Sequence, residues 1–239
     1  MAQTIGLIGG MSWESTATYY RVINEIVRDR FGGLNSAEIL LHSVNFDAIV
    51  AMQKAGRWDQ AADRLGGIGR RLAGAGAGCV LICTNTMHLV ADEVARHSGI
   101  PLIHIVDATG AALTAANARK PLLLATKYTM EQGFYADRMR DVSGIELMVP
   151  DARDRDIVHS VIFDELCQGI VKDESRRAYL DIIAKAREAG ADSVILGCTE
   201  IGLLISPDDT CVPAFDSTRI HATAAVDFAY AGETARRAA

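Results

Sequence analysis

The sequence lacks the features of several classes of protein. No basic run is longer than an arginine pair, and the formal net charge of the 239 residues is −6, so we expect no nucleic-acid partner. No apolar run approaches the ~18 residues that a membrane helix needs. The N-terminus, MAQTIGLIGGMSW, has no charged leader region. We therefore expect no membrane partner and a cytoplasmic location.

Cysteine is scarce and does not form a recognisable framework. The chain has five cysteines, an odd number with no C-x-x-C pair, at positions 79, 83, 167, 198 and 211. Disulfides are rare in the cytoplasm, so each should be a free thiol, either core filler or reactive. No Asp or His grouping surrounds them at ligand spacing, and Cys83 with His88 does not make a metal site. We expect no metal.

The composition is that of a globular protein, with 49% hydrophobic and 23% charged residues. Short runs rich in Ile, Val and Leu, such as TIGLIGG, CVLICT and SVILGCT, alternate with helical stretches such as STATYYRVINEIVRDRF. Continuous apolar strands separated by helices indicate parallel sheets covered on both faces. The length allows one large or two small domains.

Two segments of the chain each match a later segment, and the two separations in residue number are nearly equal. GCVLICTNTMHLV matches DSVILGCTEIGLL without gaps, which aligns Thr84 with Cys198 and Cys83 with Gly197, 114 residues apart. GLIGGMSWESTATYY matches PLLLATKYTMEQGFY at an offset of 115. An ancient duplication would leave this pattern, although strand-turn-helix units also resemble one another generally. We therefore expect two similarly folded halves.

Four predicted strands end in small or polar residues, where ligands bind in open parallel sheets. These turns are Gly9-Gly10-Met11-Ser12, Thr84-Asn85-Thr86, Ala125-Thr126-Lys127 and Cys198-Thr199-Glu200. The glycines suit a small anionic ligand better than a dinucleotide, because their spacing is not G-x-G-x-x-G. Cys198, just before a helix whose dipole should lower its pKa, is a candidate thiolate, the alternative being a small buried residue like Cys79 or Cys167.

The motifs CTNTMH, GCTEIGLL and IGLIGGMSWEST resemble the aspartate/glutamate racemase superfamily, whose members work without pyridoxal phosphate. The segments SAEILLHSVNFD, YTMEQGFY, IFDELCQG and PAFDSTRIHA resemble its bacterial amino-acid racemase subgroup acting on aspartate and glutamate. The resemblance covers essentially the whole chain.

The resemblance implies an α/β fold of two pseudo-symmetric lobes, each a mainly parallel sheet flanked by helices, with the active site in the cleft between them. Residues 1–100 and 210–239 would form the N-terminal lobe, and residues 101–209 the second. It also implies no cofactor and a homodimer that binds an acidic amino acid. Two cysteines, one per lobe, would exchange a proton with opposite faces of the α-carbon.

The sequence departs from this pattern at the first motif. The position before Asn85 is Thr84, whereas the family pattern has a catalytic cysteine there; Cys83 lies one residue earlier. Strand side chains alternate, so Cys83 should point away from the ligand as buried filler. A hydroxyl is a poorer base than a thiolate. We therefore expect Cys198 to be one acid/base group and Thr84 to stand in for the second.

The matched positions imply a set of substrate-binding residues: Met11, Ser12, Gln53, Thr84, Asn85, Thr86, Thr199 and Glu200. Lys54 or Lys127 could bind a side-chain carboxylate, or either could be a solvated surface residue. Glu200 could bind the α-ammonium group. Glu165 could lie at the site or pair with a helix neighbour.

Two other functions stay open from the sequence. One is a single-cysteine decarboxylase of the same superfamily, which protonates one face only and so fits Thr84. The polar residues Gln53, Asn85 and Glu200 oppose it, since an aryl substrate would need apolar walls. The other is a catalytically silent amino-acid-binding protein, which would bind its ligand without exchanging the α-proton.

Overall fold

The chain folds into two compact units. The structure is a computed structural model that describes residues 2–238, with side chains described as far as residue 233. Unit 1 extends to His104 and resumes at His221, and unit 2 is Ile105–Ile220. We expected boundaries at 100 and 209, and the compact units divide after His104 and Ile220. Leu102 pairs with Val80 of the first sheet, and residues 214–216 form a strand of the second.

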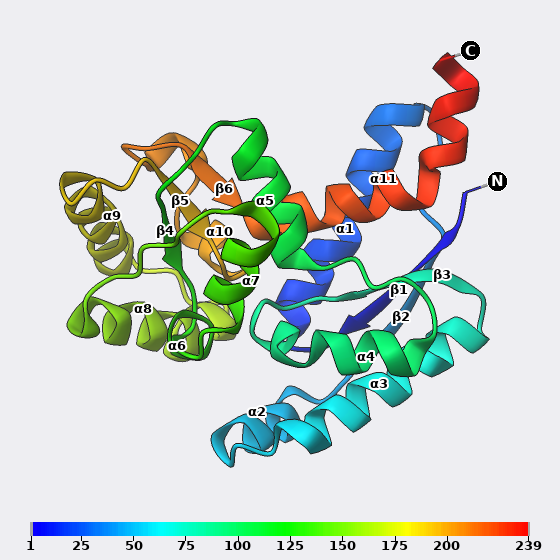
Figure 1. Cartoon of the computed structure of the whole chain (residues 1–239), viewed down its shortest axis with the longest axis horizontal. Coiled ribbons are helices and arrows are strands. Elements are labelled where there is room, and N and C mark those ends of the chain that lie inside the picture. Colours follow the sequence, from blue (N-terminus) through cyan, green and yellow to red (C-terminus); the bar gives the residue numbers. More distant parts are fainter. Residues whose placement is uncertain (1, 239) are drawn as a thin grey trace. The chain divides into compact units, whose positions relative to one another are not determined.

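Unit 1 contains a parallel three-stranded sheet with strand order β2-β1-β3. Figure 1 shows α1 and α11 on one side of this sheet and α3 and α4 on the other. The elements are β1 (Thr4–Gly9), α1 (Trp13–Phe31), β2 (Ile39–Ser43), α2 (Phe46–Lys54), α3 (Trp58–Gly74), β3 (Ala77–Ile82), the 3-10 segment η1 (Thr86–Val90), α4 (Ala91–Ser98) and most of α11 (Ser217–Ala238).

Alternation along the strands separates two apolar cores on the two faces of this sheet. Ile5, Leu7 and Leu81 pack against α1 and α11, whereas Val80 and Ile82 pack with residues of α2, α3 and α4. Successive side chains of a strand point to opposite faces, so a strand buried on both faces is apolar throughout. This explains why CVLIC has no polar residue.

Unit 2 contains a second parallel sheet with strand order β4-β5-β6 and a single core. Its elements are α5 (Ile105–Ala115), β4 (Pro121–Leu124), α6 (Lys127–Glu131), α7 (Phe134–Ser143), α8 (Ala152–Asp164), η2 (Leu166–Gln168), α9 (Asp173–Glu188), β5 (Ser193–Leu196), α10 (Ile201–Leu204), η3 (Pro207–Asp209) and β6 (Ala214–Asp216). The fold is therefore α/β with two parallel sheets flanked by helices, as predicted.

The two sheets repeat one hydrogen-bonding pattern. Val80 of β3 pairs with Leu102, and Val194 of β5, which the sequence aligns with Val80, pairs with Ala214. The N–H of Cys83 donates to Ile8 O at 2.9 Å, and the N–H of Gly197 donates to Leu124 O at 2.7 Å. Cys83 and Gly197 thus hold equivalent positions. Thr84 and Cys198, one residue later, are equivalent as well.

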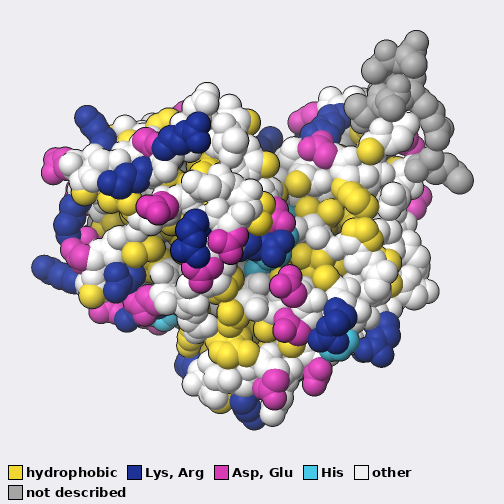
Figure 2. All heavy atoms as spheres, viewed as in Figure 1, with side chains coloured by type: hydrophobic (Ala, Val, Ile, Leu, Met, Phe, Trp, Pro, Cys, Tyr) yellow, Lys and Arg dark blue, Asp and Glu magenta, His cyan; other side chains and the backbone are white. Residues whose placement is uncertain are grey.

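Charged side chains of both signs are interspersed on the face shown in Figure 2. Several form ion pairs, including Arg138 with Asp107 at 2.5 Å and Arg155 with Glu131 at 2.8 Å. Within residues 2–238, no helix is both long enough and apolar enough to cross a membrane.

Candidate active site

The turn after β1 is built by Gly10. Its φ of 88° lies in the region that favours glycine, and a Cβ there would meet Val44 O at 2.2 Å. The Gly10 N–H donates to Thr16 Oγ1 at 2.7 Å, and Ser12 caps α1 by accepting from the Ser15 N–H at 3.2 Å. The predicted binding residue Met11 has its side chain in the core, 3% exposed.

Cys83 lies in the core of unit 1, although it is the cysteine nearest to the expected catalytic position before Asn85. Its side chain is fully buried with Cys79 and Leu81 on the α1 and α11 side of the sheet. Burial raises the pKa of the thiol well above its ordinary value. The Cys83 carbonyl accepts a hydrogen bond from Ser15 Oγ at 2.8 Å. Cys83 is thus placed as filler, as its position in the alternation predicts.

Thr84 begins the polar loop after β3. Its N–H donates to Ile82 O at 2.8 Å, which turns the chain sharply at the strand end. From Cys79 to His88, every residue except Thr84 is buried, and Thr84 is partly exposed. In this stretch the Thr84 side chain is therefore the one that a ligand can reach.

The remaining predicted residues of unit 1 are Gln53, Asn85 and Thr86, and all three are buried. Gln53, at the end of α2, is 6% exposed, and its Nε2 donates to Met87 Sδ at 3.1 Å. Asn85 and Thr86 are also buried, at 3% and 6% exposed. These three predicted binding residues are therefore buried, whereas Thr84 beside them is not.

The second motif is built around a buried carboxylate. β5 ends at Leu196, and Cys198, Thr199 and Glu200 form the turn before α10. Glu200 is 3% exposed. Its Oε2 accepts hydrogen bonds from Cys198 Sγ at 3.0 Å and Thr199 Oγ1 at 2.5 Å. The three residues therefore act as one hydrogen-bonded group.

The expected lowering of the Cys198 pKa by a helix dipole is wrong. Burial raises the pKa of this thiol well above its ordinary value, and the carboxylate of Glu200 and the nearby Cys167 raise it further. The backbone N–H of Glu200 acts in the opposite direction but is outweighed. α10 has only four residues, so its dipole is small. In the resting protein Cys198 is a protonated thiol.

Sequence reasoning treated Cys167 as core filler and so missed its place in this group. Cys167 is only partly buried, and its Sγ lies 3.8 Å from Glu200 Oε1. Burial, and then the Glu200 carboxylate, raise the pKa of this thiol too. The signal available in the sequence was weak, because Cys167 and Glu200 are 33 residues apart and no spacing rule connects them.

The structure also locates the three residues with open alternatives. Lys127 Nζ pairs with Asp156 Oδ1 at 2.6 Å. Lys54, at the end of α2, is exposed. Glu165 accepts from Ser175 Oγ at 2.6 Å and pairs with Lys172 Nζ at 3.1 Å, so the neighbour-pairing alternative describes its contacts.

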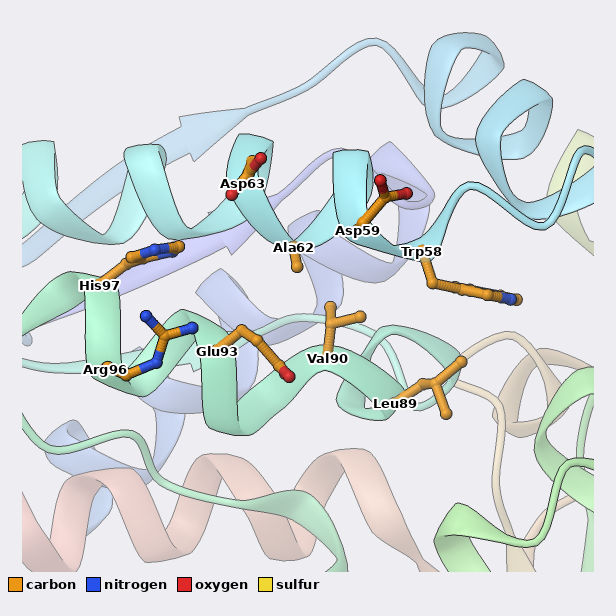
Figure 3. Close-up of a pocket in the computed structure, with 9 residues that line it drawn as sticks. All are labelled: Trp58, Asp59, Ala62, Asp63, Leu89, Val90, Glu93, Arg96 and His97. Carbon is orange, nitrogen blue, oxygen red and sulfur yellow. The ribbon is translucent and has the colours of Figure 1, made fainter.

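A cavity of about 660 Å³ lies between α3 and α4, away from these residues. Figure 3 shows Ala62 and Val90 facing each other across it, while the carboxylates of Asp59 and Asp63 point away from α4. No residue of the predicted site lines this cavity. Among the described side chains, no group of three or more His, Cys, Asp or Glu is placed to hold a metal ion.

The two parallel α/β sheets with equivalent strand ends form the fold seen in solved racemase structures. A candidate Asp/Glu racemase from Yersinia pestis is 48% identical, with 95% of this chain and 99% of that one covered and a TM-score of 0.89. An aspartate racemase homologue from Pyrococcus horikoshii is 33% identical, with coverage of 95% and 99% and a TM-score of 0.83.

More distant structures share the fold. The aspartate racemase of Picrophilus torridus is 22% identical, with coverage of 95% and 94% and a TM-score of 0.77. The model of the Asp/Glu/hydantoin racemase family matches residues 8–225. The chain belongs to this family. Its membership supports an enzyme of the isomerase class.

Proposed function

We propose that the protein is a cofactor-independent racemase of aspartate or glutamate, in which Cys198 is one acid/base group and Thr84 stands in the place of the second. The observation that carries the proposal is the equivalence of these two positions, each one residue beyond matching strand-to-strand hydrogen bonds. Racemisation needs a proton removed from one face of the α-carbon and returned to the other. Two equivalent positions, one per unit, suit that requirement.

Glu200 can accept the proton that Cys198 must lose to become a thiolate. The thiol donates to Glu200 Oε2 at 3.0 Å, so its proton can pass to the carboxylate and leave a thiolate. The thiolate then takes the α-proton and becomes a thiol again, while the α-carbon becomes a carbanion. The resting thiol is equally able to protonate a carbanion, which is the reverse step.

Thr84 makes the two faces unequal. A hydroxyl that protonates the carbanion becomes an alkoxide, which must regain a proton from water, and a neutral hydroxyl is a poor base. We expect slower turnover for the enantiomer whose α-proton Thr84 must remove. The equilibrium between the enantiomers stays at unity, because water is achiral.

The substrate class rests on the family, and its binding groups are those implied by the sequence. Asn85, Thr86, Gln53 and the backbone at Met11 would serve on the side of Thr84, and Thr199 and Glu200 on the side of Cys198. Glu200 accepts two hydrogen bonds at Oε2, and Cys167 Sγ lies 3.8 Å from its Oε1, so an α-ammonium would share the carboxylate with these donors.

We also propose that the protein is a cytoplasmic homodimer. All five cysteines are free, which suits a reducing compartment. Light scattering of the purified protein tests the dimer: a mass near twice 25.7 kDa is expected, and a mass of one chain would contradict it.

The deciding experiment is incubation with each enantiomer of aspartate and glutamate in deuterated water. α-Proton exchange is followed by NMR and inversion by chiral chromatography. We expect exchange and inversion in the wild type, loss of both in Cys198→Ala, and retention of both in the matched control Cys83→Ala. Absence of exchange with all four substrates would overturn the assignment, as would loss in Cys83→Ala alone.

One observation favours a second candidate. Only one of the two equivalent positions carries a thiol, and that thiol is protonated at rest. Such a site suits a decarboxylase in which Cys198 protonates one face after carbon dioxide leaves. Release of carbon dioxide from an α-substituted malonate, without exchange of amino-acid α-protons, would support this function over racemisation.

A further inference from the structure

Three histidines form a buried cluster under the Thr84 loop. His88, His104 and His221 are 3%, 7% and 0% exposed. The His88 ring lies edge-on to the other two, with centroids 4.7 Å from His104 and 5.4 Å from His221. The residues come from η1, from the segment before α5 and from α11. The cluster therefore ties the first motif to distant parts of the sequence.

The hydrogen bonds of His221 fix its protonation. Its Nε2 lies 2.7 Å from Ile103 O, and a carbonyl only accepts, so Nε2 carries the hydrogen. Its Nδ1 lies 2.8 Å from Tyr19 Oη and accepts from that hydroxyl. Burial lowers the pKa of His221 to about 4. The ring is neutral and is held at both nitrogens.

His88 contacts Thr84 directly. Its Nδ1 lies 2.8 Å from the Thr84 carbonyl oxygen, so Nδ1 carries a hydrogen and donates it. The Thr84 N–H is already bound to Ile82 O at 2.8 Å. Both peptide groups of Thr84 are thus anchored, one to the strand and one to the imidazole. Together they set the backbone dihedrals of Thr84 and so the direction of its side chain.

We propose that His88 is a positioning residue that aims the Thr84 hydroxyl by holding the Thr84 carbonyl. The inference rests on the proposed function, in which Thr84 works on one face of the α-carbon. Misplacing a reacting group by about 1 Å can cost about 100-fold in rate. The rings of His104 and His221 both pack against the His88 ring, which fixes the donor in turn.

Three substitutions separate positioning from packing. His88→Leu keeps an apolar filler and removes the donor. His88→Asn keeps an N–H at the place of Nδ1, and His88→Gln moves it to the place of Nε2. Each variant is assayed in deuterated water for inversion, which needs Thr84, and for exchange without inversion, which needs Cys198 alone.

We expect inversion to fall about 10-fold or more in His88→Leu and His88→Gln, with recovery to within about threefold of wild type in His88→Asn. Exchange at the Cys198 face should change less than about twofold. If His88→Leu does not fold, the Asn and Gln variants decide, and equal inversion rates in these two would overturn the proposal.

Other results are equally decisive. Parallel loss of exchange and inversion in all variants would show a merely structural role for His88 and overturn the inference. Unchanged inversion in a folded His88→Leu would do the same. A wild type that exchanges no α-proton would instead refute the proposed function, so the two failures are distinguishable.

Discussion

Acidification should destabilise unit 1 in part through His221, and His221→Gln should remove the part of the loss that is due to His221. The imidazole is fully buried, donates to Ile103 O and accepts from Tyr19 Oη. A proton on Nδ1 would meet the Tyr19 hydroxyl hydrogen, and the charge would have no water around it. The folded state therefore resists protonation, whereas the unfolded chain does not.

The magnitude follows from the two pKa values. Burial lowers the pKa from 6.5 to about 4 in the folded protein. As the pH falls below 6.5, the unfolded chain binds the proton first, so stability present at neutral pH is lost progressively until the pH passes the folded value. The complete loss is about 3 kcal/mol, and the loss at about pH 5 is about 2 kcal/mol.

Urea denaturation followed by tryptophan fluorescence measures this effect in the right unit. Both tryptophans, Trp13 and Trp58, belong to unit 1, which also contains His221. We expect the wild type to lose about 2 kcal/mol more than His221→Gln between about pH 7.5 and about pH 5. Circular dichroism at the higher pH confirms that the variant is folded.

Cys83→Ala is the matched control, since Cys83 is also fully buried and its raised thiol pKa keeps it protonated at both pH values. The loss of stability that Cys83→Ala causes should be the same at both pH values. If wild type and His221→Gln lose equal stability on acidification, His221 is not neutral in the folded state and the assigned hydrogen bonds are wrong.

Three further predictions concern the strand-end turns. Gly10→Ala should cost about 3 kcal/mol or more in urea denaturation, because its Cβ would lie 2.2 Å from Val44 O. The control Gly99→Ala, at a left-handed helix end with φ of 71°, ψ of 8° and open space around the Cβ, should cost only about 1 kcal/mol. Glu200→Gln removes a charge that raises the Cys198 pKa, so alkylation of Cys198 at mildly alkaline pH, followed by peptide mass spectrometry, should become faster. Lys127→Met should leave racemisation unchanged, since Lys127 pairs with Asp156; a raised KM would restore Lys127 as a substrate ligand.

Much of the candidate site was predictable because the chain repeats itself. The gap-free match placed Thr84 opposite Cys198 and Cys83 opposite Gly197, and the hydrogen bonds of Cys83 and Gly197 have that same equivalence. Alternation along β3 predicted that Cys83 faces the core. Both inferences depend on local periodicity, which a sequence records directly.

The pKa of Cys198 was not predictable by the same means. Its position before a helix suggested a lowered value, but the helix has four residues and the Glu200 carboxylate turns back onto the thiol. The effect of a neighbouring charge depends on its distance and burial, and a side chain two residues away can face either direction. Only the folded turn shows that Glu200 accepts from Cys198.

The sequence by itself determined the α/β class, the repeated strand-turn-helix units and the residues at the strand ends, because periodicity and turn residues act over short stretches of chain. The tertiary structure decided the boundaries at 104 and 220, the approach of Cys167 to Glu200 and the cluster of His88, His104 and His221. These contacts join side chains that are far apart in the sequence. His88 and His104 are 16 residues apart, and His88 and His221 are more than 100 residues apart. Such contacts form only when the sheet and its helices pack.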